Sequence, residues 1–428
     1  MDLSNAYIIG IDNEAFKGCT GLTGITLSPW VDGSYAVDLA SGLPNYGGFL
    51  GNNAFAGCKN LVSVGVSAGK APTCGANVFG SDGTNAGPQP NSCEVKFSGS
   101  ADAYDTGGTT GYMSYRGNST FMALLTKTMD EDNTDYTVVP QRHADVILHR
   151  TFKAGWNTLA LPFGSPKDIT YKSIVGAQIF INALHHNSSS TDFMIAAYRG
   201  LNTTTNTFYF LKYADGTGGL DEFEPILVKM GDSDINKTDN KYTFTNVEVN
   251  YDADKNTEYT ATDTKSKIGA LAGTTSGKID GSYNHDDNTK FQNCSYDKFY
   301  FTGTLDKQSC TAVASASVEN FIQAGDYIIQ DNNFYKVAAG STYGLKGFRG
   351  WFKQLTPSAS GAKSSTLSID VVSGDETTDI VKIDANGEEV KDMSNGKVYN
   401  INGQLVGTSL NGLSKGLYIV NGKKYVVK

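Results

Sequence analysis

Oxygen-bearing side chains at alternate positions form the pattern in this sequence that is closest to a binding site for an ion. Asp252, Asp254, Asn256 and Glu258 alternate along the chain, and Asp263 follows at the twelfth position counted from Asp252. Calcium loops use such spacing because Ca²⁺ takes about six to eight oxygen ligands. The sixth position lacks the glycine of those loops. Two interpretations therefore stay open, a calcium site and an acidic surface loop without a cation.

The residue types that catalyse reactions do not fall into a recognisable order. The sequence has no GxSxG elbow, no HExxH and no GxGxxG after a predicted strand. The two adjacent histidines, His185 and His186, precede a polar run, which favours a solvated pair over a metal site. We therefore expect a non-enzymatic protein with no cofactor other than the calcium candidate. An enzyme whose site is assembled from distant loops is the alternative.

Composition and charge restrict the class of protein further. The formal net charge is −9, which disfavours nucleic acid or an anionic membrane as the partner. Aromatic residues make up 11% of the chain and Gly, Thr and Asn are abundant, which is typical of β-rich extracellular proteins. The sequence contains no run of 18 apolar residues, so we expect no transmembrane segment. The N-terminal residues lack the pattern of a signal peptide, which we expect either to have been removed or to lie outside the given sequence.

Six cysteines are present and none forms a CxxC pair, so a zinc ribbon is not expected. We expect Cys19 and Cys58 to be buried as small apolar residues, as unpaired cysteines usually are. An even number of cysteines allows disulfides in a secreted protein. The pairs to test first are Cys74–Cys93 and Cys294–Cys310.

An internal repeat organises the N-terminal part of the sequence. Residues 10–27 and 50–66 align so that Phe16 matches Phe55 and Cys19 matches Cys58, and a degenerate third copy contains Phe79. A period in the twenties is typical of leucine-rich solenoids, in which each unit buries one face on its neighbours. Each copy predicts a turn at the AFxGC segment and a short strand with alternate residues inward.

An insertion separates the first two copies, within residues 28–48. It carries Trp30, Tyr35 and Tyr46 among small polar residues. Insertions in solenoids map to loops that often form the binding face, and aromatic anchors are typical of recognition loops. These three aromatic residues are therefore the candidate partner-binding site. The alternative is a satellite core in which they pack under the loop.

The central part contains many short segments that alternate between apolar and polar residues, separated by Gly, Asn, Asp, Ser and Thr. This pattern predicts an antiparallel β-sandwich. The predicted strands include ADVILHRTF, NTLALPF, NTFYFLKY, EPILVKM, KYTFTNVEV, KFYFTGTL and RGWFKQL.

The C-terminal part contains two Asn-Gly pairs, Asn402-Gly403 and Asn421-Gly422, each between segments rich in β-forming residues. Asn-Gly between such segments predicts a β-hairpin, because both turn residues tolerate positive φ. A small C-terminal β-domain is therefore expected.

Three segments resemble one class of bacterial surface protein. Residues 7–80 resemble the BspA-like leucine-rich repeats of Bacteroidetes, close to IGxxAFxGCxxLxxIxLP, and CEVKFSGSADAYDTGGTTGY resembles their terminal cap. The segment GWNTLALPF resembles a WNTLxLPF signature that follows such repeats, and FEPILV resembles its partner strand. The final segment VYNINGQLVGTSLNGLSKGLYIVNGKKYVVK resembles the sorting domain of type IX secretion substrates.

The resemblance implies an extracellular or bacterial cell-surface location and adhesion to host or bacterial macromolecules. The expected fold is mainly β: a short leucine-rich solenoid with its cap at 1–137, a β-sandwich domain at 138–372 and a C-terminal β-domain at 380–428. The expected function is a non-enzymatic binding protein, an adhesin, whose partner is an extracellular protein or glycan. The alternative is a glycan-binding accessory protein of polysaccharide use.

Overall fold

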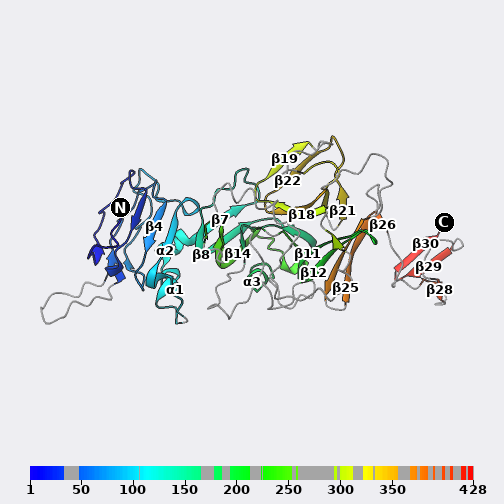
Figure 1. Ribbon diagram of the computed structural model, residues 1–428, viewed down its shortest axis with the longest axis horizontal. Helices are drawn as coiled ribbons and strands as arrows, with labels where there is room; N and C mark the ends of the chain where they lie inside the picture. The colour runs from blue at the N-terminus through cyan, green and yellow to red at the C-terminus, as the bar shows by residue number, and fades with distance from the viewer. Residues whose placement is uncertain are drawn as a thin grey trace.

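The computed structural model shows a mainly β chain with several separate sheets and few helices. It runs from the N-terminal repeats at one end to a small C-terminal sheet at the other (Figure 1). The described residues are 1–32, 48–105, 107–164, 178–185, 193–212, 223, 225–252, 257–258, 294–295, 299–311, 322–330, 333–354, 367–373, 376–383, 389–390, 398–400, 405–407, 416–420 and 423–427.

The repeated segments form two parallel three-stranded sheets. One sheet has the order β1-β3-β5 and the other the order β2-β4-β6, so neighbouring strands come from successive copies. In the second sheet Ile25 lies beside Val64, and Val64 beside Val95, with all three side chains buried. The strands are β1 (Gly10–Ile11), β2 (Gly24–Thr26), β3 (Phe49–Leu50), β4 (Ser63–Val66), β5 (Thr73–Cys74) and β6 (Glu94–Phe97).

The turns that contain the phenylalanines also stack on one another. The Phe16 and Phe55 rings are parallel with centroids 5.2 Å apart, and Phe55 and Phe79 follow at 5.4 Å. Backbone hydrogen bonds join the turns, from the Phe16 N–H to the Ala54 carbonyl and from the Phe55 N–H to the Val78 carbonyl. The phenylalanines aligned by sequence therefore stack in their order along the chain.

Short helices follow β6 and close the apolar cluster of the repeats. A 3₁₀ turn, η4 (Gly99–Asp102), comes first, within the segment that resembles a terminal cap. The helices α1 (Gly111–Arg116) and α2 (Ser119–Leu125) come next, and the Asn118 side chain accepts the Thr120 N–H at the start of α2. Phe121 of α2 packs edge-on against Phe79, which extends the aromatic stack.

A four-stranded sheet, in the order β10-β14-β8-β7, continues directly from α2. Its β7–β8 pair is parallel and its other pairs are antiparallel. We call the two sheets of repeated strands, together with η4, α1 and α2, the repeat unit. Two side-chain amides join the four-stranded sheet to the repeat unit: Gln141 of β8 bonds to β6, and Asn91 bonds to β7. The strands are β7 (Thr126–Asp130), β8 (Gln141–His149), β10 (Phe163–Gly164) and β14 (Lys241–Val249).

An eight-stranded sheet forms the middle of the chain. Its order is β26-β25-β24-β12-β11-β13-β9, and β17 pairs with β11 beside this path. The segments GWNTLALPF and FEPILV lie next to each other in it, since β9 and β13 pair with Leu159 opposite Ile226. The strands are β9 (Gly155–Leu159), β11 (Met194–Asn202), β12 (Thr207–Lys212), β13 (Ile226–Met230), β17 (Cys294–Ser295), β24 (Leu367–Ser373), β25 (Glu376–Ile383) and β26 (Glu389–Val390).

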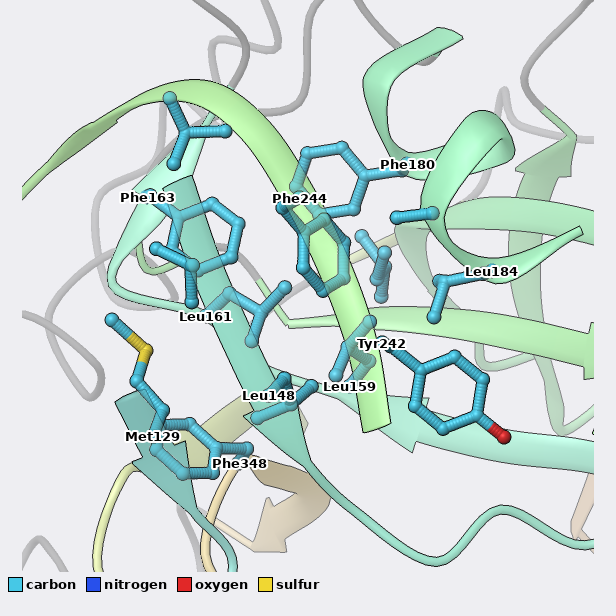
Figure 2. Packing of buried hydrophobic residues seen from close by; sticks show 14 of the residues in the cluster. Met129, Leu148, Leu159, Leu161, Phe163, Phe180, Leu184, Tyr242, Phe244 and Phe348 are labelled. Carbon is cyan, nitrogen blue, oxygen red and sulfur yellow. The ribbon is translucent and has the colours of Figure 1, made fainter. Parts of the chain in front are cut away.

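Strand β11 is buried on both faces, because alternate residues enter different apolar clusters. Ile195 and Ala197 join the cluster shared with the four-stranded sheet, whereas Met194, Ala196 and Tyr198 join the cluster shared with β18 and β23. In the first cluster, α3 (Gln178–Leu184) places Phe180 and Leu184 against the side chains of β14 (Figure 2). This explains why β11 is apolar at consecutive positions instead of alternating.

The remaining strands form smaller sheets. Both Asn-Gly hairpins are confirmed, since β27 pairs with β28 and β29 with β30, within one four-stranded sheet. The other sheets are β18-β23-β20-β21, β19-β22 and β15-β16. The strands are β15 (Tyr251–Asp252), β16 (Thr257–Glu258), β18 (Phe299–Thr304), β19 (Gln308–Thr311), β20 (Tyr327–Gln330), β21 (Asn333–Lys336), β22 (Thr342–Leu345), β23 (Arg349–Gln354), β27 (Val398–Asn400), β28 (Leu405–Gly407), β29 (Gly416–Val420) and β30 (Lys423–Val427).

Two features differ from the sequence expectations for the central part. The pairing is not purely antiparallel, because β12–β24 and β7–β8 are parallel. Strand β25 also crosses residue 380, the expected start of the C-terminal domain, and forms a hairpin with β24 in which Ser373 lies opposite Glu376. The separate C-terminal sheet begins at Val398.

Candidate functional site

Trp30 lies on a short 3₁₀ turn, η1 (Pro29–Asp32), at the start of the insertion. The Ser28 hydroxyl fixes this turn, since it donates to the Ala6 carbonyl at 2.6 Å and accepts the N–H groups of Ile8 and Trp30. Val31 anchors the turn in the apolar cluster of the repeats, with 1% of its surface exposed. The backbone beneath Trp30 is therefore held in place by both hydrogen bonds and burial.

Tyr7 and Trp30 form an aromatic pair on this turn. Their ring centroids are 5.5 Å apart, and 59% of Tyr7 is exposed. Among the described residues, the buried cluster of the repeats includes Val31 but not Trp30, which is half-buried. Tyr35 and Tyr46 lie outside the described residues. Sequence reasoning missed Tyr7, because it precedes the first repeat.

Only Asp252 and Glu258 of the calcium candidate lie within the described residues. Asp252 lies in β15 and Glu258 in β16, and the two strands pair with Asp252 opposite Thr257. Asp254, Asn256 and Asp263 lie outside the described residues. The described part of the chain contains no group of three or more His, Cys, Asp or Glu side chains placed to hold a metal ion. The calcium site therefore stays a prediction.

His185 pairs with a buried carboxylate and is not a freely solvated residue. Its Nδ1 lies 2.8 Å from Oδ1 of Asp234, which has no exposed surface, and its ring stacks on Phe193. An Asp–His pair can orient an imidazole for acid–base chemistry. In the described part of the chain, no hydroxyl or thiol is hydrogen-bonded to His185 to complete such a site. His186 lies outside the described residues.

A polar cluster with two buried and two partly exposed members, which sequence reasoning missed, lies where the repeat unit meets the four-stranded sheet. We call Asp102, Arg142, His143 and Glu248 the junction cluster. Arg142 of β8 donates to both carboxylate oxygens of Asp102, at 2.6 and 2.7 Å, and its Nε lies 3.3 Å from Glu248 of β14. The ring of His143 lies between the two carboxylates, 3.5 Å from each. Asp102 comes from η4, so the cluster joins the two parts of the molecule.

Burial and charge act differently on the two carboxylates of the junction cluster. Burial raises the pKa of Glu248, and the nearby His143 and Arg142 only partly offset this effect. Burial acts in the same direction on Asp102, but its contacts with His143 and Arg142 outweigh burial and lower its pKa. The contacts with Arg142 and His143 therefore favour the ionised form of both carboxylates, but they outweigh burial only at Asp102.

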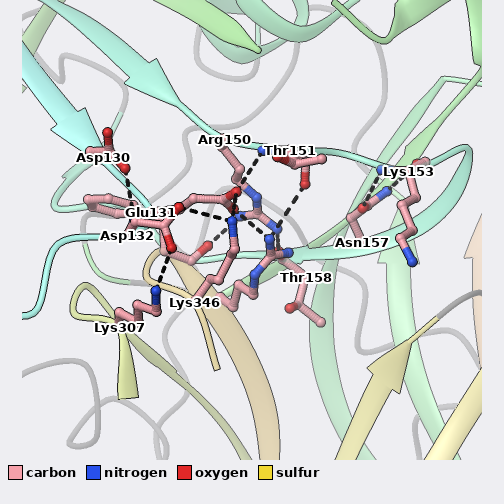
Figure 3. A network of polar contacts seen from close by, with 12 residues as sticks. Asp130, Glu131, Asp132, Arg150, Thr151, Lys153, Asn157, Thr158, Lys307 and Lys346 are labelled. Atoms are coloured by element: carbon pink, nitrogen blue, oxygen red, sulfur yellow. Dashed lines mark hydrogen bonds and ion pairs between the residues drawn. The ribbon is translucent and has the colours of Figure 1, made fainter. Parts of the chain in front are cut away.

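A second polar network lies at Glu131, which directly follows β7 (Figure 3). It joins this residue to Lys346 and to Arg349, the first residue of β23. The Glu131 carboxylate accepts from Lys346 at 2.8 Å, from Arg349 at 2.5 Å and from the Thr151 N–H at 3.1 Å. Beside it, the fully buried Arg150 donates to the carbonyls of Phe348 and Thr158. Burial, and then the charge of Arg349, lowers the pKa of Arg150 well below its ordinary value.

Lys127 is a buried cation that has only carbonyl partners in the described structure. Its ammonium group donates to the carbonyls of Pro90, Cys93 and Leu124, at 2.6, 2.8 and 3.0 Å. Burial lowers its pKa to about 8. The three bonds tie β7 to the end of α2 and to η3 (Pro90–Ser92). This arrangement uses every donor of the ammonium group for structure.

The cysteine expectations are corrected in two respects. Cys58 is buried, as expected, but Cys19 is exposed, because it lies at the outer end of the first turn, with no preceding copy described above it. Cys74 and Cys93 are both free thiols, so the structure does not contain the disulfide proposed between them. The side chain of Cys310 lies outside the described residues, so its pairing with Cys294 stays a prediction.

Comparisons with known proteins return no relatives: no protein-family model, no curated protein and no solved structure matches this chain. In the described part of the chain, no helix is both long and apolar enough to cross a membrane.

Proposed function

We propose that this chain is a secreted or cell-surface binding protein without enzymatic activity, an adhesin that contacts host or bacterial macromolecules. In this proposal the N-terminal part is a short leucine-rich solenoid of the BspA-like kind, and the central part is a β-sandwich domain that carries it. The C-terminal part acts as a type IX sorting domain. The partner is an extracellular protein.

One observation carries the proposal: the stacked repeats hold an aromatic pair, the half-buried Trp30 and the exposed Tyr7, at the start of the insertion. The Phe16, Phe55 and Phe79 rings and the hydrogen bonds between turns make the repeats a rigid support. Trp30 and Tyr7 lie at its edge on a backbone fixed by Ser28. Aromatic side chains on a rigid support lose little conformational entropy on binding, which suits them to recognition.

The test is binding of the purified chain to a panel of extracellular-matrix proteins and to a glycan array. A Trp30→Ala variant should keep the melting temperature of the wild type and lose most of the binding. Val62→Ala is the matched control, since Val62 is an exposed apolar residue of the same unit, and it should change neither property. A loss of about 3–5 kcal/mol in the Trp30→Ala variant would instead indicate a satellite core.

The panel also separates the alternative functions. Binding confined to glycans would favour a glycan-binding accessory protein, and hydrolysis of any polysaccharide on the array would favour an enzyme. Calcium dependence of binding, abolished by a chelator, would support the acidic loop at residues 252–263 as a cation site. Cell-surface delivery that is unchanged after removal of the C-terminal sheet would contradict the sorting role.

A further inference from the structure

The turns that contain the phenylalanines are joined by backbone hydrogen bonds that run in one direction. The first, second and third turns comprise residues 13–19, 52–58 and 76–80. Three N–H groups of the first turn donate to carbonyls of the second turn, and three of the second turn donate to carbonyls of the third. The donor–acceptor pairs, with distances of 2.7 to 2.9 Å, are Glu14–Asn52, Phe16–Ala54, Gly18–Ala56, Asn53–Ala76, Phe55–Val78 and Gly57–Gly80. Each turn therefore donates to the turn that follows it along the chain.

The carbonyls on the outer side of the first turn are left without donors. Those of Asn13, Ala15 and Lys17 occupy the positions that accept bonds in the second turn, but in the described part of the chain no group donates to them. The neighbouring N–H groups are already used, since those of Ala15 and Lys17 donate to nearby carbonyls and that of Asn13 donates to the Asp12 carboxylate. We call these three carbonyls, together with the side chains of Ala15 and Phe16, the open end.

Burial shows that the open end matches one half of an interface that the turns form twice. Ala54 and Phe55 of the second turn have no exposed surface, because a turn packs on each side of them. Their counterparts in the first turn differ: Ala15 is exposed and Phe16 is half-buried. The ring of Phe16 stacks on Phe55 through one of its faces. The open end therefore continues an interface that already exists within the molecule.

Residues 1–3 cover the neighbouring edge of the repeat unit but not the open end. The Leu3 N–H donates to the Thr26 carbonyl and the Thr26 N–H donates to the Met1 carbonyl, each at 2.9 Å, so these residues run parallel to β2. In the described part of the chain they form no hydrogen bond with the first turn. The chain thus fills one edge with its own residues, whereas the open end beside it still offers its acceptors.

A second copy of this chain does not fit the open end. Two open ends placed face to face would bring carbonyls together with no donor between them, and a buried carbonyl without a partner is unfavourable. The opposite end of the stack is closed, since Phe121 of α2 packs against Phe79 of the third turn. The occupant of the open end must therefore be a different segment that brings N–H donors.

We propose that the open end is a docking surface for a polypeptide segment of another protein, which adds one further turn to the stack. The segment donates alternate backbone N–H groups to the carbonyls of Asn13, Ala15 and Lys17 and places an aromatic side chain on the outer face of Phe16. In recognition of this kind the main-chain bonds give affinity and the side-chain contacts give specificity. The surface shares no residue with the Trp30–Tyr7 pair, so it is a second interaction site.

The experiment titrates a synthetic peptide with the sequence of residues 50–60, LGNNAFAGCKN, into the isotope-labelled full chain under reducing conditions. This peptide contains the second turn, whose N–H groups and phenylalanine have the required spacing. Amide chemical shifts of residues 13–19 should change and saturate at millimolar peptide. A control peptide with an N-methyl group at the position of Phe55 keeps every side chain but lacks one donor. It should bind about tenfold more weakly, the factor expected for one hydrogen bond.

A variant of the chain tests the location of the site. Ala15→Arg places a bulky side chain on the open end and should abolish the shift changes without lowering the melting temperature, because Ala15 is exposed. Val62→Arg is the matched control at another exposed apolar residue of the repeat unit, and it should bind the peptide normally. If Ala15→Arg does not fold, the two peptides still decide the question.

Three results would overturn the proposal: no saturable shift change in the wild type, equal affinity for the two peptides, or peptide binding that persists in a folded Ala15→Arg variant. Self-association of the wild type that Ala15→Arg abolishes would also overturn it, since the open end would then belong to a contact between two copies.

Discussion

The side-chain amide of Gln141 forms with Val95 both hydrogen bonds that a further strand would form. Its Oε1 accepts the Val95 N–H at 2.8 Å, and its Nε2 donates to the Val95 carbonyl at 3.0 Å. Val95 is the middle of β6, the last strand of the repeat sheet, and both residues are 1% exposed. A single side chain thus supplies, at Val95, the two hydrogen bonds that a neighbouring strand would supply.

Replacing Gln141 with Leu should destabilise the protein by about 2–4 kcal/mol, because a buried N–H and a buried carbonyl each lose a partner. Asn91→Leu is the matched control. Asn91 makes the same two bonds to Thr128, at 2.7 and 2.9 Å, but at an exposed site where water can replace it. Urea unfolding should show a loss below about 1 kcal/mol for Asn91→Leu. Equal losses in the two variants would contradict this account.

Lys127 should make the stability rise with pH at alkaline values. Burial lowers its pKa from 10.5 to about 8, so between these values the unfolded chain binds a proton that the folded protein does not. The stability contribution of Lys127 should therefore increase by up to about 3 kcal/mol as the pH rises from 8 to 10.5. The measurement is the difference in unfolding free energy between the wild type and Lys127→Met at each pH. A difference that stays constant or falls would show that the ammonium group remains charged.

Gly57 should not tolerate a side chain. Its φ is +77°, and an added Cβ would overlap the Asp82 carboxylate of the next turn. Gly57→Ala should cost about 1–3 kcal/mol through backbone strain, and the overlap should add to this cost. Gly83→Ala is the control, since Gly83 has a positive φ with nothing within 4 Å, so it should show the strain alone. Thermal melts of Gly57→Ala with and without Asp82→Ala would separate the two terms, and no recovery in the double variant would exclude the overlap.

Two truncations should differ in their effect on the central sheet. Removing residues 391–428 takes away the C-terminal sheet, which pairs only within itself in the described part of the chain, and should leave the melting temperature of the rest nearly unchanged. Removing 380–428 also deletes the half of β25 that pairs Ile380 with Ile369 and Ile383 with Leu367. The longer deletion should lower the melting temperature. Identical melting curves for the two truncated proteins would show that β25 contributes little.

Local patterns in the sequence were enough to predict the strands and the aligned positions of the repeats. Alternation predicted β8, β14 and β18, and the Asn-Gly pairs predicted both C-terminal hairpins. The alignment of Phe16, Phe55 and Phe79 predicted which rings would occupy equivalent positions. These successes depend on periodicity or turn chemistry within a few residues, which a single sequence displays directly.

The junction cluster and the parallel strand pairs could not be predicted in this way. Arg142 and Asp102 are far apart in the sequence, and the bulge in β8 that brings His143 between two carboxylates leaves no periodic signal. The parallel partner of β12 is β24, whose apolar segment fits an antiparallel neighbour equally well. Contacts of this kind depend on which strands become neighbours, a property of the whole chain and not of any short segment.

The central position of β12 also affects the order in which the protein can fold. Strand β12 is buried throughout most of its length, but its parallel neighbour β24 is synthesised long afterwards. Until β24 emerges, one edge of β12 has no strand beside it, and the apolar cluster around Phe208 and Phe210 lacks Ile369 and Val371. Sheets that await distant strands form slowly and expose surfaces that aggregate. During synthesis, this chain should therefore depend on a chaperone or on delayed folding until the segment that carries β24 is complete.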